Sequence, residues 1–223
     1  ARRQLNYARG VTAAMSVGFA LFLYLWCLRT YGTSTAIISL SLYLFCYPLL
    51  AHSQLATTDF PAAALTFISA VAFERYLRDA SKPALIGYAL AASALCLTKH
   101  SGMPIVAIFT AIGAGLAWRG SPRFSALSRR QRVVRFATET LVVALSIVVF
   151  INIAYRFDRT LMTTDAILAA DEPKNWISRR FDGNLITSDG VFGILPGWLP
   201  IPLPFDYLIG LATIRAQNTL GHG

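Results

Sequence analysis

Six apolar runs, separated by short polar segments, organise the first two thirds of the chain. They lie at about residues 11–28, 34–50, 60–77, 84–98, 103–118 and 138–155. A helix that crosses a bilayer needs about 20 residues, so each run is long enough, or nearly so, to predict a transmembrane helix. The fourth and fifth runs are short and are joined only by "TKHSG". This favours a tight helical hairpin and leaves a re-entrant pair open.

The pattern changes near residue 156. Residues 156–223 hold seven of the eleven acidic residues and include the proline-rich stretch "ILPGWLPIPLPFDYLIG". Proline at this density forbids a continuous helix there. We therefore predict an all-α integral membrane protein, with a transmembrane domain over residues 1–155. An irregular, ordered, non-cytoplasmic segment over residues 156–223 follows it, with "LPGWLPIPLPF" at the bilayer interface.

Composition supports a membrane protein and excludes other classes. Of the 223 residues, 55% are hydrophobic and 14% are charged, whereas soluble domains average about 45–50% apolar and about 25% charged residues. The net charge of +9 does not indicate nucleic-acid binding, because the arginines are not interleaved with aromatic residues in a binding motif. The three cysteines all lie within apolar runs and form neither a disulfide framework nor a metal cluster.

The arginines predict how the chain is oriented. Six of them, and no acidic residue, lie in the predicted loop over residues 119–135, which the positive-inside rule places in the cytoplasm. Counting spans from there, residues 52–59, residues 98–102 and the segment after about residue 157 face the opposite side. Three N-terminal arginines also fall on that side, against the rule: Arg2, Arg3 and Arg9. Either the first span is assigned wrongly, or these arginines meet an anionic group.

Asp59 is the only charged residue between Thr30 and Phe73. One interpretation is helix capping, because Asp59 precedes Phe60 and Pro61 and would interact favourably with the dipole of the following helix. The other is functional, because an ionisable group at membrane depth marks a substrate or ion path. Both interpretations stay open, and a cap can have a second role.

Lys99 is the corresponding lone base, at the outer end of the fourth run. It could extend its ammonium group to the interface, or it could bind a phosphate together with its neighbour His100. The predicted topology favours phosphate binding, because several polar groups share the non-cytoplasmic face and together suit a phosphate-bearing lipid. These residues are Asp59, Lys99, His52, His100, Arg2 and Arg3. His52 and Asp59 lack a third ligand, so we predict no metal site. We interpret the acids of the last segment as solvated surface: Asp165, Asp171, Glu172, Asp182 and Asp189.

The order of these motifs resembles the GT-C glycosyltransferases, and within them the group of protein O-mannosyltransferases and aminoarabinose transferases. The matching elements run over most of the chain: "RRQLNYARG", "RTYG", "AHSQLATTDFP", "ERYLRD", "LCLTKHSG", the arginine-rich loop and "LPIPLPFDYLIGL". The resemblance implies a bacterial inner-membrane or plasma-membrane enzyme that moves a sugar from a polyprenyl-phosphate carrier to an acceptor on the non-cytoplasmic face. The acceptor would be a protein, a lipid or a glycan, and a divalent metal is left open as a cofactor.

By this resemblance Asp59 and Lys99 match motif positions near the donor site, flanked by His52 and His100. Members of the family carry their main catalytic acid in a first outer loop, which would lie upstream of Ala1. Asp59 is the second candidate for that role. We therefore expect the 223 residues alone to bind polyprenyl phosphate but not to transfer sugar. Two rivals remain, a transporter or flippase whose path is lined by Asp59 and Lys99, and a membrane scaffold without enzymatic activity.

Overall fold

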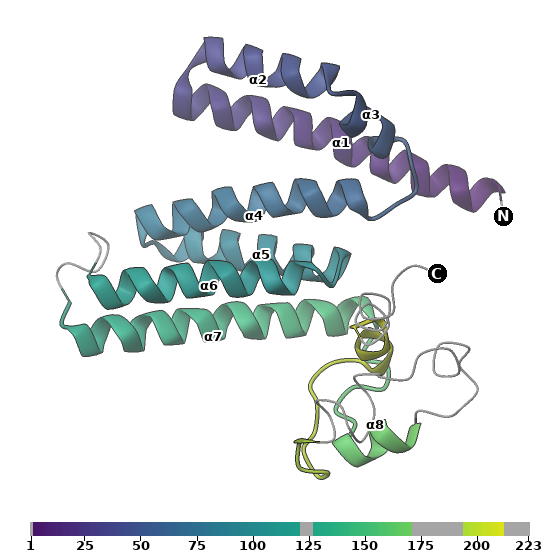
Figure 1. Ribbon diagram of the computed structural model, residues 1–223, viewed down its shortest axis with the longest axis vertical. Coiled ribbons are helices and arrows are strands. Elements are labelled where there is room, and N and C mark those ends of the chain that lie inside the picture. Colours follow the sequence, from purple (N-terminus) through teal and green to yellow (C-terminus); the bar gives the residue numbers. More distant parts are fainter. Residues whose placement is uncertain (1, 121–126, 171–193, 212–223) are drawn as a thin grey trace. The chain divides into compact units, whose positions relative to one another are not determined.

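The computed structural model describes residues 2–120, 127–170 and 194–211, and within these ranges the chain is helical (Figure 1). It divides into two compact units, Ala1–Gly115 and Leu116–Gly223. Its helices are α1 (Arg2–Tyr31), α2 (Thr33–Phe45), α3 (Tyr47–Ser53), α4 (Asp59–Asp79), α5 (Lys82–Thr98), α6 (Gly102–Arg119), α7 (Arg129–Ala154) and α8 (Thr164–Ala170). The prediction of an all-helical chain is confirmed for this part of the sequence.

Three of these helices are long and apolar enough to cross a bilayer. They cover Arg3–Tyr31, Gly102–Arg119 and Arg129–Ala154, and the bent pair α2–α3 would be a fourth. The other two helices of the first unit fall short for different reasons. In α4 a cluster of charged residues fills the last turns, and α5 has only 17 residues. The class of helical membrane protein is supported, whereas six spans remain a prediction.

The predicted span over residues 34–50 is broken in the structure. Helix α2 ends at Phe45, α3 begins at Tyr47, and the two helices meet at 66°. Cys46 between them is extended, with ψ of 94°, and Pro48 lies at the start of α3. Proline lacks an amide donor and its ring clashes with the carbonyl four residues earlier, here that of Leu44 in the last turn of α2, so α2 does not continue through this point.

The arginine-rich segment is also more helical than we predicted, because α7 begins at Arg129. Ser128 and Gln131 form a reciprocal capping box at this end, which satisfies amides that would otherwise have no helical partner. Arg132 then donates from Nε to the carbonyl of Ala117 and from Nη1 to that of Leu127, both at 3.0 Å. The prediction of a loop over residues 119–135 was therefore wrong for residues 129–135. A polar sequence pattern did not reveal the cap.

Aromatic and small side chains hold the first unit together. Phe19 of α1 makes edge-to-face contacts with Tyr43 and Phe60, and the Tyr43 hydroxyl lies 2.6 Å from that of Ser16. Helices α4 and α5 pack along buried alanines of α5, which permit close approach of the two backbones. A second aromatic cluster joins α4, α5 and α6: Phe73, Tyr76, Tyr88 and Phe109.

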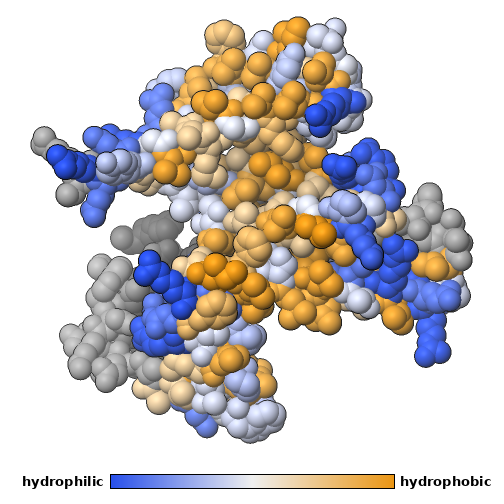
Figure 2. Space-filling view, turned by 180° about the vertical axis from the view of Figure 1, so that it is seen from behind, coloured by the Kyte–Doolittle hydropathy of each residue, from blue (hydrophilic) through white to orange (hydrophobic). Residues whose placement is uncertain are grey.

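Large apolar side chains remain uncovered along the long helices. Examples are Leu21, Leu42, Ile108, Leu141 and Leu145, each more than half exposed. Figure 2 shows hydrophobic atoms across the exposed helical surfaces. Soluble monomers rarely expose contiguous apolar surface on this scale. The surface therefore supports a lipid environment for these helices.

In the second unit, the proline-rich stretch folds against the end of α7 and α8. The carboxamide of buried Asn152 donates to the Pro202 carbonyl at 2.9 Å and accepts from the Thr160 hydroxyl at 2.6 Å. A small apolar core forms around Ile167, Phe205 and Leu208. Residues 205–211 are helical, so the prolines limit helix length without preventing helix formation. Of the predicted surface acids, Asp165 is exposed, and Asp171, Glu172, Asp182 and Asp189 lie outside the described residues.

Candidate functional site

Asp59 is the first residue of α4, and its carboxylate does not cap the helix. The N-cap is Thr58, and no side-chain hydrogen bond caps this end. The carboxylate still lies at the positive end of the helix dipole, which favours its charged form. Pro61 fits in the first turn, where its missing amide costs nothing. The backbone thus places Asp59 at the junction of a turn and a helix, and its carboxylate makes no hydrogen bond to the amides of the first turn of α4.

Lys99 is fixed by the tight hairpin between α5 and α6. It is the C-cap of α5, with extended backbone angles, and its amide still donates to the Leu95 carbonyl at 3.1 Å. The Gly102 amide then donates to the Lys99 carbonyl at 2.9 Å. A Cβ atom at Gly102 would lie 2.9 Å from the backbone carbonyl of Leu95. Only glycine allows the chain to turn this closely after Lys99.

The two turns bring Asp59 and Lys99 into contact. Nζ of Lys99 lies 2.6 Å from Oδ1 of Asp59, although 40 positions separate the residues. The side chains are 38% exposed for Lys99 and 53% exposed for Asp59, so the pair is open to a ligand. The hydrogen bond from Lys99 and then its positive charge lower the pKa of Asp59. Slight burial opposes this, and His52 adds a smaller lowering effect.

The other predicted site residues are His52, His100, Arg2 and Arg3, and of those whose side chains the structure describes only His52 affects the pKa of Asp59. His52 is exposed in the last turn of α3 and influences Asp59 electrostatically. His100 is half-buried in the hairpin next to Lys99. Arg3 is exposed near the start of α1, and within the described part of the chain no contact joins it to Asp59 or Lys99. Arg2 begins α1, but its side chain lies outside the described structure.

This arrangement offers a cationic donor held by a carboxylate. Lys99 carries three N–H donors, of which Asp59 accepts one. Within the described residues, the other two donors have no hydrogen-bond partner and are left for a phosphate oxygen. Because its pKa is lowered, Asp59 is a weak base near neutral pH. Its observed geometry suits orienting Lys99 better than removing a proton. Among the residues that the structure describes, no three His, Cys, Asp or Glu side chains are grouped to hold a metal ion.

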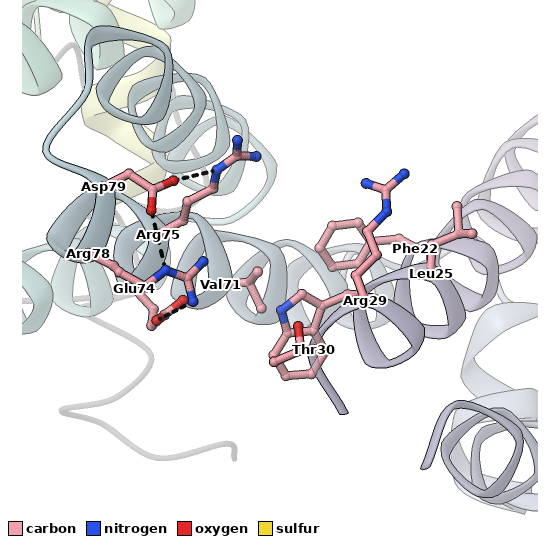
Figure 3. A pocket seen from close by; sticks show the side chains of 10 residues that line it. Phe22, Leu25, Arg29, Thr30, Val71, Glu74, Arg75, Arg78 and Asp79 are labelled. Atoms are coloured by element: carbon pink, nitrogen blue, oxygen red, sulfur yellow. Dashed lines mark hydrogen bonds and ion pairs between the residues drawn. The ribbon is translucent and has the colours of Figure 1, made fainter. Parts of the chain in front are cut away.

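A second feature, which our sequence analysis did not identify, lies at the other end of α4. A cavity of about 610 Å³ opens between the last turns of α1 and α4 (Figure 3). Its wall combines apolar side chains such as Phe22 and Val71 with three arginines, Arg29, Arg75 and Arg78. Our sequence analysis gave Arg75 and Arg78 no role in binding. The sequence carries no signal that Arg29, 46 positions before Arg75, would join them.

Comparisons with protein-family models, with curated proteins and with solved structures each found no match for this chain.

Proposed function

We propose that this chain is part of a GT-C-type membrane glycosyltransferase, which moves a sugar from a polyprenyl-phosphate carrier to an acceptor on the non-cytoplasmic face. The observation that carries the proposal is the contact between Asp59 and Lys99. It joins the only charged residue between Thr30 and Phe73 to the only charged residue between Lys82 and Arg119, at a single, partly open point. The six-span topology, with both residues outside the cytoplasm, belongs to the same proposal.

Lys99 has the chemistry that this reaction needs at the donor. Sugar transfer releases a lipid phosphate, whose developing negative charge must be stabilised in the transition state. The ammonium group of Lys99 supplies the positive charge that stabilises the phosphate. His100 is the next residue of the same hairpin. Asp59 holds the ammonium group in place through one N–H donor, which leaves the other two for the phosphate. We thus assign phosphate binding to Lys99 and positioning to Asp59.

The two roles predict different outcomes in binding and transfer assays. Lys99→Ala should weaken binding of polyprenyl phosphate by the purified chain, and it should reduce transfer by the intact enzyme on the order of a hundredfold. Asp59→Asn should retain binding, because Lys99 keeps its charge and its N–H donors, yet it should reduce transfer, because Lys99 is no longer held in place. Lys82→Ala is the matched control, because Lys82 is an exposed lysine at the opposite end of α5.

Binding can be measured as retention of radiolabelled polyprenyl phosphate on immobilised protein. Transfer can be measured with a labelled lipid-phosphate sugar in membranes. If Lys99→Ala binds the carrier as well as Lys82→Ala does, Lys99 is not the phosphate ligand and the proposal fails. Equal loss of binding in Asp59→Asn and Lys99→Ala would show that Asp59 does not act only through position.

The broken helix favours one other function. Interrupted spanning helices are typical of transporters, where the break lines a path, and α2 and α3 meet at 66°. A flippase for a lipid phosphate would also use a charged pair such as Asp59 and Lys99. Proteoliposomes with a fluorescent polyprenyl phosphate distinguish the two functions. Translocation across the bilayer without sugar transfer would support the flippase.

A further inference from the structure

The cavity between α1 and α4 lies far from the Asp59–Lys99 pair. It is lined by residues from the last turns of both helices, including Arg29 on α1 and Arg78 on α4. A helix rises about 1.5 Å per residue, so Arg78 lies about 30 Å along α4 from Asp59. This separation is about the thickness of the hydrocarbon core. The cavity is therefore a second site, beyond the proposed donor site.

The charged side chains that line the cavity sum to a net positive charge. Arg75 and Arg78 share the Asp79 carboxylate at 3.1 and 3.3 Å, and Arg78 also contacts Glu74 at 3.2 Å. Three arginines thus face two carboxylates. Each guanidinium has five N–H donors, and these ion pairs use few of them. Arg29 forms no ion pair with any of the described residues. Figure 3 shows Arg29 and Arg75 reaching from the two helices to either side of the opening.

The rest of the wall of the cavity is mostly apolar. Phe22, Leu25, Trp26 and Val71 line it. A smaller cavity of about 150 Å³ shares Phe22, Val71 and Arg75 with it and continues between α4 and α5. The combined volume of the two cavities is within the range of small-molecule sites, about 300–1,000 Å³. A ligand that fits this wall has an anionic head and an apolar tail.

We propose that this cavity binds an anionic phospholipid, with the phosphate between Arg29 and Arg75 and an acyl chain along the apolar wall. Basic pockets between membrane helices are suited to anionic head groups. Guanidinium groups bind phosphate through paired N–H donors. Trp26, which also lines the cavity, has the amphipathic ring that is enriched at membrane interfaces. A free anion would gain nothing from this apolar wall, whereas the acyl chain of a lipid would be buried against it.

Trp26 provides a direct probe of occupancy. The other three tryptophans are replaced by phenylalanine, and the full chain is reconstituted in vesicles of phosphatidylcholine. Brominated phosphatidylglycerol or brominated phosphatidylcholine is then added at equal mole fraction, because bromine on an acyl chain quenches a tryptophan that it touches. We expect the anionic lipid to be preferred by about fivefold, the factor typical of one arginine near an anionic head group.

Charge variants test whether the arginine causes the preference. Arg29→Gln should abolish it, and Arg29→Lys should keep most of it. Arg9→Gln is the matched control, because Arg9 is an exposed arginine at the other end of α1, and it should leave the preference unchanged. Circular dichroism of each variant verifies that the helices persist.

Two results would overturn the proposal. One is equal quenching of Trp26 by the anionic and the zwitterionic lipid. The other is a preference that survives Arg29→Gln. Displacement of brominated phosphatidylglycerol by inorganic phosphate at millimolar concentration would also overturn it, because the site would then recognise the anion without the lipid. Failure of any of these tests leaves the proposed role of Lys99 untouched, since no residue is shared between the two sites.

Discussion

Nζ of Lys99 lies 2.6 Å from Oδ1 of Asp59, across the junction of the α3–α4 turn and the α5–α6 hairpin. Each residue is the only charged group in a long uncharged stretch of sequence. The contact therefore neutralises two charges that would each be costly near the bilayer alone. It also means that a substitution at one residue changes the surroundings of the other.

The energy of this contact can be measured with a double-mutant cycle of Asp59→Asn and Lys99→Met. Because both side chains are partly exposed, we expect a coupling of about 0.2–1 kcal/mol in the free energy of unfolding, decreasing with salt. Unfolding of the purified protein in detergent provides the measurement. A coupling of zero at low salt would show that the ion pair does not persist in the folded protein.

The same pair predicts a dependence of stability on pH. Lys99 lowers the pKa of Asp59 from its ordinary 3.8, so the unfolded chain takes up this proton at higher pH than the folded chain does. The contribution is then fully present above about pH 5 and is lost as acid protonates the folded carboxylate below about pH 4. The stability difference between wild type and Asp59→Asn should follow this course. A difference that is constant down to pH 3 would contradict the assignment.

Gly102→Ala should disturb the hairpin that positions Lys99. The new Cβ would meet the Leu95 backbone at 2.9 Å, and relieving such an overlap costs about 1–3 kcal/mol. Gly115→Ala on the same helix is the matched control, because nothing lies within 4 Å of its Cβ and alanine favours a helix. We expect a lower melting temperature and weaker carrier binding only for Gly102→Ala. Equal melting temperatures would show that the hairpin adapts.

Cysteine labelling tests the proposed orientation. In a background without the native cysteines, Gln54→Cys and Ser101→Cys should react with an impermeant thiol reagent added outside, and Arg130→Cys should react only after lysis. All three positions are exposed. Ser53 is less suitable for labelling, because it is buried and its hydroxyl donates to the Leu50 carbonyl. Labelling of Arg130→Cys from outside, without Gln54→Cys, would reverse the topology and remove the argument for a non-cytoplasmic site.

Asn152→Ala should loosen the proline-rich segment from α7. The substitution leaves the Thr160 hydroxyl and the Pro202 carbonyl without this partner, a loss of about 1–3 kcal/mol for buried polar groups. We expect faster proteolysis of residues 194–211. Val149→Ala, at a half-exposed position of the same helix, should have little effect. Similar proteolysis rates for both variants would show that the apolar core around Phe205 holds this segment alone.

The sequence by itself determined the class and the approximate positions of the helices. Long apolar runs cannot satisfy their backbone in lipid except as helices, so the predicted runs near residues 103–118 and 84–98 differ little from α6 and α5. It also singled out Asp59 and Lys99, because a lone charge in an apolar run is conspicuous. The positions of helix breaks and helix starts were predicted less well, because they depend on single prolines and capping residues within or beside the apolar runs. Pro48 broke one predicted span, and the capping box at Ser128 began α7 inside a predicted loop.

Only the tertiary structure decided which residues meet. Asp59 could have been a cap, but the fold gave that place to Thr58 and turned the carboxylate to Lys99. Arg29 and Arg75 looked unrelated until α1 and α4 packed together and enclosed a cavity. Hydrophobic periodicity predicts which face of a helix is buried. It does not predict which other helix packs against that face, because the hydrophobic effect is nondirectional. Which charged ends share a cavity depends on helix crossing and turn geometry, and these are set by many small contacts at once.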